Sequence, residues 1–312
     1  MEKYIILPDV TCDLSEEIRT RIGLEDYIQG HVHINGESYR TCLDWSLISR
    51  DEFYKTLASK KNSVSSAAAS PEEYYQTFRK YVEAGYGVIS MSLSSKISVT
   101  YNITVSAADR IKAEFPDARI CCVDTLRMSG SFGLLVMYAA EMRKSGASFD
   151  EVVAWLEENK HKVHQMGPID DLTFIARRGK ISKGKAFMGN LVGVKPMGDS
   201  NADGYVTVLA KVKGIKNALD ATVAYVERVA TEPKAQTVLI MHSDRESYAL
   251  ELRDRFLKRN SVGEVLVSDV FSGCGTNIGP GMISVYFLGE PVSPDCEKEK
   301  EALCAAIAEC TK

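Results

Sequence analysis

The chain lacks several features that would assign it to common classes of protein. No apolar stretch in its 312 residues approaches the roughly 20 residues that a membrane-spanning helix needs. The first residues, Met1-Glu2-Lys3-Tyr4, lead straight into a predicted strand and do not resemble a signal peptide. The net charge is −4, which argues against nucleic acid as a partner, because nucleic-acid binding usually needs a basic surface.

The chain also lacks the short motifs of redox, metal and nucleotide sites. None of its eight cysteines forms a C-x-x-C pair, so neither a zinc site nor a redox motif is expected, and we expect a reducing, cytoplasmic compartment. There is no P-loop, no G-x-G-x-x-G, no G-x-S-x-G and no H-E-x-x-H. The sequence therefore predicts no metal, no cofactor and no evident catalytic base.

What the chain does contain is a hydroxyl-rich segment directly after an apolar run. The run VISMSL at residues 88–93 predicts a buried strand, and SSKISVTY at residues 94–101 follows it into a predicted helix. In open α/β sheets, ligands bind at the carboxyl ends of strands, and free N–H groups at a helix start favour an anion. We therefore expect the hydroxyl groups of Ser94, Ser95, Ser98 and Thr100 to face an anionic group.

Hydrophobic periodicity predicts an α/β protein of two domains. The main strands and helices of the first half are expected at residues 4–7, 15–22, 31–34, 49–58, 88–93, 98–115, 119–123, 129–142 and 149–160. Their alternation indicates a parallel, three-layer α/β/α domain over residues 1–160. In the second half, strands are expected at 172–175, 191–194, 205–210, 237–241, 264–270 and 282–287, with helices at 215–229, 245–259 and 297–308. This higher share of strands indicates a mixed-sheet, two-layer α/β domain over residues 161–312, covered on one face.

Four turns carry chemistry that could form a site. They lie at residues 9–13 (DVTCD), 65–71 (SSAAASP), 94–101 (SSKISVTY) and 273–281 (GCGTNIGPG). The first and third follow predicted strands, and the second could do so, which would gather them at one edge of a sheet. Each turn taken alone also fits a helix cap or a tight turn. A basic turn, RRGK at residues 177–180, fits either a solvated loop or a site for an anion or an acidic partner.

Seven segments in register resemble motifs of the DegV family, which includes the fatty-acid-binding subunit of bacterial fatty-acid kinase. Residues 9–14 resemble D-S-x-x-D-L, with Val10 at the serine, and residues 66–71 resemble T-S-Q-P-S-P, with Ser66 at the threonine. Residues 94–101 resemble S-S-x-L-S-G-T-Y, with Val99 at the glycine. The remaining matches are residues 124–133 (D-S-x-x-x-S-G-G-x-G), 172–181 (L-x-Y-L-x-x-G-G-R-I), Lys195-Pro196 (K-P) and 276–281 (T-H-x-G-P-G, with Asn277 at the histidine).

The resemblance implies a function as well as a fold. It implies that a long-chain fatty acid binds between two α/β domains, that the second domain forms the lipid tunnel, and that a separate ATP-dependent kinase phosphorylates the exposed carboxylate. It assigns head-group binding to Ser66 and Ser98, with Thr276, Asn277 and Gly279 beside them. It also implies that the basic turn containing Arg177, Arg178 and Lys180 docks the kinase or neutralises the acyl phosphate. The protein itself is expected not to be an enzyme.

Two other functions fit the sequence. One is an enzyme acting on a small phosphorylated or carboxylated metabolite, because related folds occur in dihydroxyacetone kinases. The missing nucleotide motif and Asn277 argue against this function. The other is a lipid-sensing protein that serves no kinase, which the departures at Val99 and Asn277 keep open.

Overall fold

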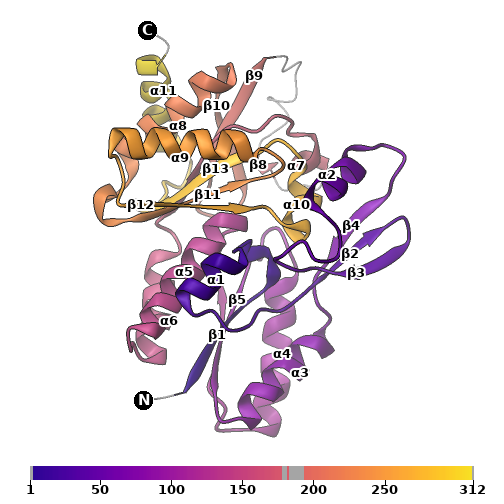
Figure 1. Cartoon of the computed structure of the whole chain (residues 1–312). Helices are drawn as coiled ribbons and strands as arrows, with labels where there is room; N and C mark the ends of the chain where they lie inside the picture. The colour runs from indigo at the N-terminus through magenta and orange to yellow at the C-terminus, as the bar shows by residue number, and fades with distance from the viewer. Residues whose placement is uncertain (1–2, 178–180, 183–192, 311–312) are drawn as a thin grey trace.

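The computed structural model describes residues 3–177, 181–182 and 193–310 (Figure 1). The first half contains β1 (Tyr4–Pro8), α1 (Glu16–Ile22), β2 (His31–Ile34), β3 (Glu37–Arg40), α2 (Arg50–Ala58), β4 (Val64–Ala67), α3 (Pro71–Glu83), β5 (Gly87–Ser92), α4 (Thr100–Glu114), β6 (Ile120–Asp124), α5 (Ser129–Lys144) and α6 (Phe149–Asn159). These bounds confirm the strands and helices predicted for this half to within a few residues. A short 3-10 helix at Val10–Cys12 follows β1.

The first sheet has three parallel strands in the order β1-β5-β6. Every residue of β1 and β5 is buried, as is typical of parallel strands with helices on both faces. Alternate side chains point to opposite sides: Ile5 and Leu7 pack with α3 and α4, whereas Ile6 packs with α1, α5 and α6. The parallel three-layer arrangement predicted for this half is therefore confirmed.

A small antiparallel sheet, β3-β2-β4, stands beside the parallel one. It carries Ser66, which pairs with Val32 across β2 and β4. Asn35-Gly36, a residue pair that favours hairpin turns, connects β2 and β3, with a φ of 52° at Asn35 and of 91° at Gly36. The segment at residues 65–71, which could have followed a strand, begins within β4, so Ser66 lies in the strand and residues 68–71 follow it.

The second half contains β7 (Val163–Met166), α7 (Thr173–Arg177), β8 (Ile181–Ser182), β9 (Val194–Ser200), β10 (Val206–Lys213), α8 (Ile215–Val229), β11 (Thr237–His242), α9 (Glu246–Arg259), β12 (Glu264–Asp269), α10 (Ser272–Ile278), β13 (Ile283–Leu288) and α11 (Glu297–Cys310). Its main sheet has the order β12-β11-β13-β7, with parallel and antiparallel pairs, so the predicted mixed sheet is confirmed. A smaller sheet has the order β8-β10-β9.

The helix α5 joins the two halves into one packed body. The second half's own helices, α8 and α9, cover one face of its main sheet, as expected. The other face is covered by α5 of the first half, which lies between the two sheets (Figure 1). Eleven residues of α5 are buried, so this helix is apolar nearly all round, as an internal helix should be. The division into domains at residues 160 and 161 stays a prediction.

Two expectations for the second half were wrong. Residues 172–175, predicted as a strand, lie mostly in α7, where the Asp171 carboxylate accepts a hydrogen bond from Thr173 N at 2.7 Å and so caps the helix start. A four-residue apolar run does not distinguish a strand from a short helix. The glycine-rich turn at residues 273–281 begins as the buried helix α10. The strand β7 was not predicted, and the strand expected at residues 191–194 falls mostly outside the described residues, with β9 starting at Val194.

In the described part of the chain, no helix combines the length and the apolar character that a membrane span needs.

A buried carboxyl group, that of Asp13, connects the two halves at the end of β1. One oxygen accepts a hydrogen bond from the Ser129 hydroxyl at 2.7 Å, at the start of α5, and the other accepts from Phe271 N at 3.0 Å, at the start of α10. Asp13 itself adopts the left-handed conformation, with a φ of 54°. Its side chain is fully buried, and this burial raises the pKa of Asp13 to about 8.

We predict that Asp13→Ala lowers the free energy of unfolding by about 2–5 kcal/mol, because it removes two hydrogen bonds and leaves their donors unpaired. Urea unfolding at pH 7 measures this loss. Asp13→Asn is the control, since an amide retains one acceptor and is already neutral. Because the folded-state pKa is raised, the stability that wild-type Asp13 contributes is lost as the pH rises through about 8, whereas the Asn variant should not show this loss. An alanine variant with the wild-type urea midpoint would contradict the prediction.

Candidate functional site

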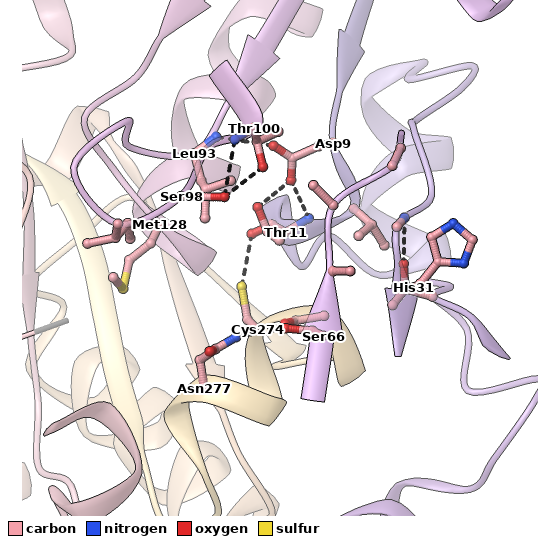
Figure 2. A pocket seen from close by; sticks show the side chains of 18 of the residues that line it. Asp9, Thr11, His31, Ser66, Leu93, Ser98, Thr100, Met128, Cys274 and Asn277 are labelled. Carbon is pink, nitrogen blue, oxygen red and sulfur yellow. Dashed lines mark hydrogen bonds between the residues drawn. The ribbon is translucent and has the colours of Figure 1, made fainter. Parts of the chain in front are cut away.

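A pocket lies where the first sheet, β4 and α10 meet, and it brings together three of the predicted site residues. Ser66, Ser98 and Asn277 all line it, although they come from β4, the turn after β5, and α10. The pocket is partly open to solvent, and its empty space, open solvent included, amounts to about 900 Å³. Figure 2 shows the Ser98 hydroxyl on one side of the pocket and the Ser66–Asn277 pair on another.

Ser98 is positioned by the turn that the sequence singled out. The carboxylate of Asp124, at the end of β6, accepts hydrogen bonds from Ser95 N at 3.1 Å and Leu126 N at 3.2 Å, which ties this turn to the neighbouring one. The Ser98 oxygen accepts a hydrogen bond from Thr100 N at 3.3 Å and lies 2.8 Å from the Thr100 hydroxyl. A hydroxyl that accepts from the backbone keeps its own proton available for a ligand or for Thr100.

Val99, at the family's glycine position, does not occupy this pocket. Its φ of −82° is one that any residue adopts, so no glycine is required there. The Val99 side chain is 64% exposed and is not part of the pocket lining. The substitution of glycine by valine therefore leaves the hydroxyl-bearing turn intact.

Asn277 and Ser66 form a polar pair across the pocket floor. The Asn277 amide nitrogen donates a hydrogen bond to the Ser66 oxygen at 3.0 Å. The helix α10 can approach closely because Gly275 has no side chain: an added Cβ there would lie 2.8 Å from the Tyr54 hydroxyl oxygen. As an acceptor from Asn277, Ser66 keeps its hydroxyl proton for a further partner, so the pair presents a donor to the pocket.

Asp9 gives the pocket its unusual electrostatics. Its carboxylate accepts hydrogen bonds from Thr11 N at 2.8 Å, from the Thr11 hydroxyl, and from Leu93 N at 3.1 Å. Burial raises the pKa of Asp9 to about 6, although these hydrogen bonds act in the opposite direction. Among the described residues that line the pocket, none is a lysine or arginine. The lining does include His31, so the polar side chains that an anion could meet there carry hydroxyl, amide and imidazole groups. The sequence pattern marked the turn at residues 9–13 but did not identify Asp9 as a pocket residue.

Two predicted ligand contacts, Thr276 and Gly279, are not in this pocket. The Thr276 hydroxyl donates to Ser272 O at 2.8 Å within α10 and is buried. Gly279 ends α10 with a φ of 78°, and an added Cβ would lie 2.3 Å from the Phe174 ring. Thr276 therefore stabilises α10 through a hydrogen bond within the helix. Gly279 allows α10 to end close to the Phe174 ring of α7.

A second, more apolar cavity adjoins the first. It lies between α7, β9, β10 and β13 and is partly open to solvent. Met128, Ile175 and Ile278 line both cavities, so the two spaces share a wall. Sequence reasoning missed these three residues, because an apolar side chain that lines a cavity has the same pattern as one in the core.

The predicted basic turn is only partly described. Arg177 is exposed at the end of α7, two residues after the cavity-lining Ile175, whereas Arg178 and Lys180 lie outside the described residues. The segment before α7 is held by Asp170, whose carboxylate forms ion pairs with Lys195 and, at 2.6 Å, with Arg245. Lys195 belongs to the matched K-P pair, so this motif anchors the segment that leads to Arg177. Within the described residues, no group of three His, Cys, Asp or Glu side chains is placed to hold a metal ion.

The fold and the site define a class: an α/β protein with a parallel and a mixed sheet, and a ligand pocket at the carboxyl ends of the parallel strands. A model of the family described as uncharacterised proteins of the DegV family matches residues 3–290. The chain belongs to the DegV family.

Individual relatives agree with this assignment. A DegV domain-containing protein of Clostridium perfringens is 31% identical over 294 residues, covering 94% of this chain and 100% of the relative. The structure of a fatty-acid-binding DegV protein from Thermus thermophilus is 26% identical, with a TM-score of 0.82, covering 92% of this chain and 99% of that one. The fatty acid kinase B3 protein of Streptococcus pneumoniae, solved with linoleic acid, has a TM-score of 0.78 with 92% and 100% coverage; at 17% identity it shows a shared fold alone.

Proposed function

We propose that this protein binds a long-chain fatty acid, with the carboxylate in the pocket of Ser66, Ser98 and Asn277 and the tail in the adjoining cavity. The observation that carries the proposal is the pairing of the two spaces. One presents hydroxyl and amide groups, the other is mostly apolar, and Met128, Ile175 and Ile278 line both. A lipid carrier needs this combination, because the tail gains from leaving water and the head requires fixed polar partners.

The head-group pocket suits a carboxylate that is held but not transformed. The Ser66 and Ser98 hydroxyls can each donate a hydrogen bond to an oxygen of the ligand. We infer a binding role without catalysis, in keeping with the family's solved member from Thermus thermophilus, which binds a fatty acid.

The alternative functions receive less support. An enzyme for a small metabolite would have little use for the second, apolar cavity beside the polar pocket. A lipid sensor without a kinase would use the same two cavities, so the geometry does not separate it from a carrier. The kinase experiment below separates these two roles.

We predict that the purified protein carries a fatty acid and that Ser98→Ala weakens its binding about tenfold or more. The alanine loses a hydrogen bond to a charged group, which typically contributes roughly 1.5–3 kcal/mol. Native mass spectrometry with lipid extraction detects the retained acid, and displacement of a fluorescent fatty acid measures the affinity.

Val99→Gly is the matched control, because Val99 follows Ser98 in the sequence but its side chain does not line the pocket. This variant should bind the fatty acid as tightly as the wild-type protein does. Recovery of no fatty acid from the wild-type protein, together with no binding of added acid, would overturn the proposed function. Normal affinity in the Ser98 variant would remove only this residue from the site.

We predict that fatty-acid affinity rises as the pH falls from 8 to 6. The raised pKa of Asp9, about 6, means that Asp9 is ionised at pH 8 and repels the ligand carboxylate, and that it takes up a proton as the pH approaches 6. Calorimetry at pH 7 in buffers of different ionisation enthalpy should therefore detect net proton uptake on binding. Asp9→Asn should abolish this uptake; its persistence in that variant would assign the proton to another group.

We further propose that a separate ATP-dependent kinase phosphorylates the bound acid and docks beside Arg177. The support is the family-matched position of the basic turn and the short distance in sequence between the exposed Arg177 and the cavity-lining Ile175. Arginine suits both roles, because its planar fork binds carboxylates and phosphates at two points.

Replacing Arg177, Arg178 and Lys180 together by alanine should leave fatty-acid affinity within about twofold of wild type, because tail burial supplies most of the affinity. The same variant should lose acyl-phosphate formation with a cognate kinase, since docking and charge neutralisation both require the cations. A control triple variant of exposed Lys216, Lys258 and Lys298, on α8, α9 and α11, should retain it. Full phosphorylation of the Arg177 triple variant would contradict a docking role.

A further inference from the structure

The wall of the second cavity carries polar side chains on an inward face of the main sheet. Gln165 on β7 and Tyr286 on β13 are direct cross-strand partners, and Ser284 lies two residues before Tyr286. Residues opposite each other, and residues two apart on one strand, point to the same side of a sheet. All three therefore share one face, and all three line the cavity.

The rest of that face is apolar. Val163, two residues before Gln165, packs in the same core as Leu239 and Met241, which are the β11 partners of Tyr286 and Ser284. The first turn of α5 lies directly on the Tyr286 ring, since a Cβ added at Gly130 would be 2.2 Å from it. The face of a strand that packs against an internal helix is normally apolar. A polar side chain on this face therefore requires a hydrogen-bond partner.

The hydrogen bonds in the protein leave part of this polar group unused. The Ser129 hydroxyl donates a hydrogen bond to Asp13. Burial raises the pKa of Tyr286, and hydrogen bonds with the Ser284 and Ser129 hydroxyls act in the opposite direction. The backbone N–H of Gln165 donates to Asp199 at 2.9 Å. Its side-chain amide has no hydrogen-bond partner among the described residues, although Gln165 is only 9% exposed. The amide atoms of Gln165 are not among the side-chain atoms that are fully buried without a partner, so they reach open space, and Gln165 lines the cavity, where a ligand could meet them.

We propose that the second cavity is built for a fatty acid that carries an oxygen atom part-way along its chain, as a hydroxyl or keto group. This inference rests on the proposed function, because the carboxylate must occupy the pocket of Ser66 and Ser98. The oxygen of the chain accepts a hydrogen bond from the Gln165 amide, and a hydroxyl also donates to the amide oxygen or to Ser284. A plain alkyl chain leaves these groups facing hydrocarbon.

The polar group lies close to the entrance of the second cavity. Ser129 lines this cavity, and the residue before it, Met128, lines both cavities. The ligand's oxygen is therefore expected along the middle of a long chain and not at its methyl end. A series of positional isomers can locate it.

Displacement of a fluorescent fatty acid tests the proposal. The probes are stearic acid and its hydroxystearic isomers with the hydroxyl on successive carbons between the seventh and the fourteenth. We expect one or two neighbouring isomers to bind about tenfold more tightly than stearic acid, since a satisfied buried donor is worth roughly that factor. Gln165→Leu should remove or reverse this preference while binding stearic acid at least as tightly. Ser284→Ala, a smaller change that is expected to fold in any case, should reduce the preference.

Gln76→Leu, on the exposed surface of α3, is the control and should keep the wild-type preference. Equal affinity of the wild-type protein for stearic acid and every isomer would overturn the proposal while leaving fatty-acid binding in place; buried water would then satisfy Gln165. A preference for one isomer that Gln165→Leu and Ser284→Ala both leave unchanged would also overturn it. Failure of every acid to bind would instead overturn the proposed function.

Discussion

The buried carboxyl of Asp13 is the constraint on which the arrangement of the site depends. It accepts hydrogen bonds from the starts of α5 and α10, two helices that are far apart in the sequence. Through α5 it fixes the helix that lies between the two sheets, and through α10 it fixes the helix that carries Asn277. The same short segment after β1 also supplies Asp9 to the head-group pocket. One buried polar group thus links the segment after β1, which supplies Asp9 to the pocket, to the starts of α5 and α10.

The proposed ligand site relies on hydroxyl, amide and imidazole groups. Asn277 replaces a histidine of the family motif, and the described lining residues include no lysine or arginine. Beside them lies Asp9, whose raised pKa keeps it partly protonated near neutral pH. We propose that such a pocket holds a carboxylate mainly through hydrogen bonds. Selectivity then falls to the tail, and the polar wall around Gln165 provides a basis for it.

The sequence predicted most of the fold, and it identified three residues that line one pocket, because their side chains follow a strand or belong to a family motif. The strongly periodic segments were correct because burial on both faces leaves a continuous apolar run, as in β1 and β5. The short helices α7 and α10 were not predicted. In such short apolar or glycine-rich segments, tertiary packing and not the local sequence decides the conformation. Ser66, Ser98 and Asn277 were brought together as expected. Met128, Ile175 and the inward-facing Gln165 could not be recognised, since nothing local distinguishes a cavity wall from a core.

A crystal structure of the protein with a bound eighteen-carbon fatty acid tests the central claim most directly. The account predicts a ligand carboxylate within hydrogen-bonding distance of the Ser66 and Ser98 hydroxyls, and an alkyl chain that passes Met128, Ile175 and Ile278 into the second cavity. A carboxylate bound elsewhere, or a chain that leaves the second cavity empty, would contradict it.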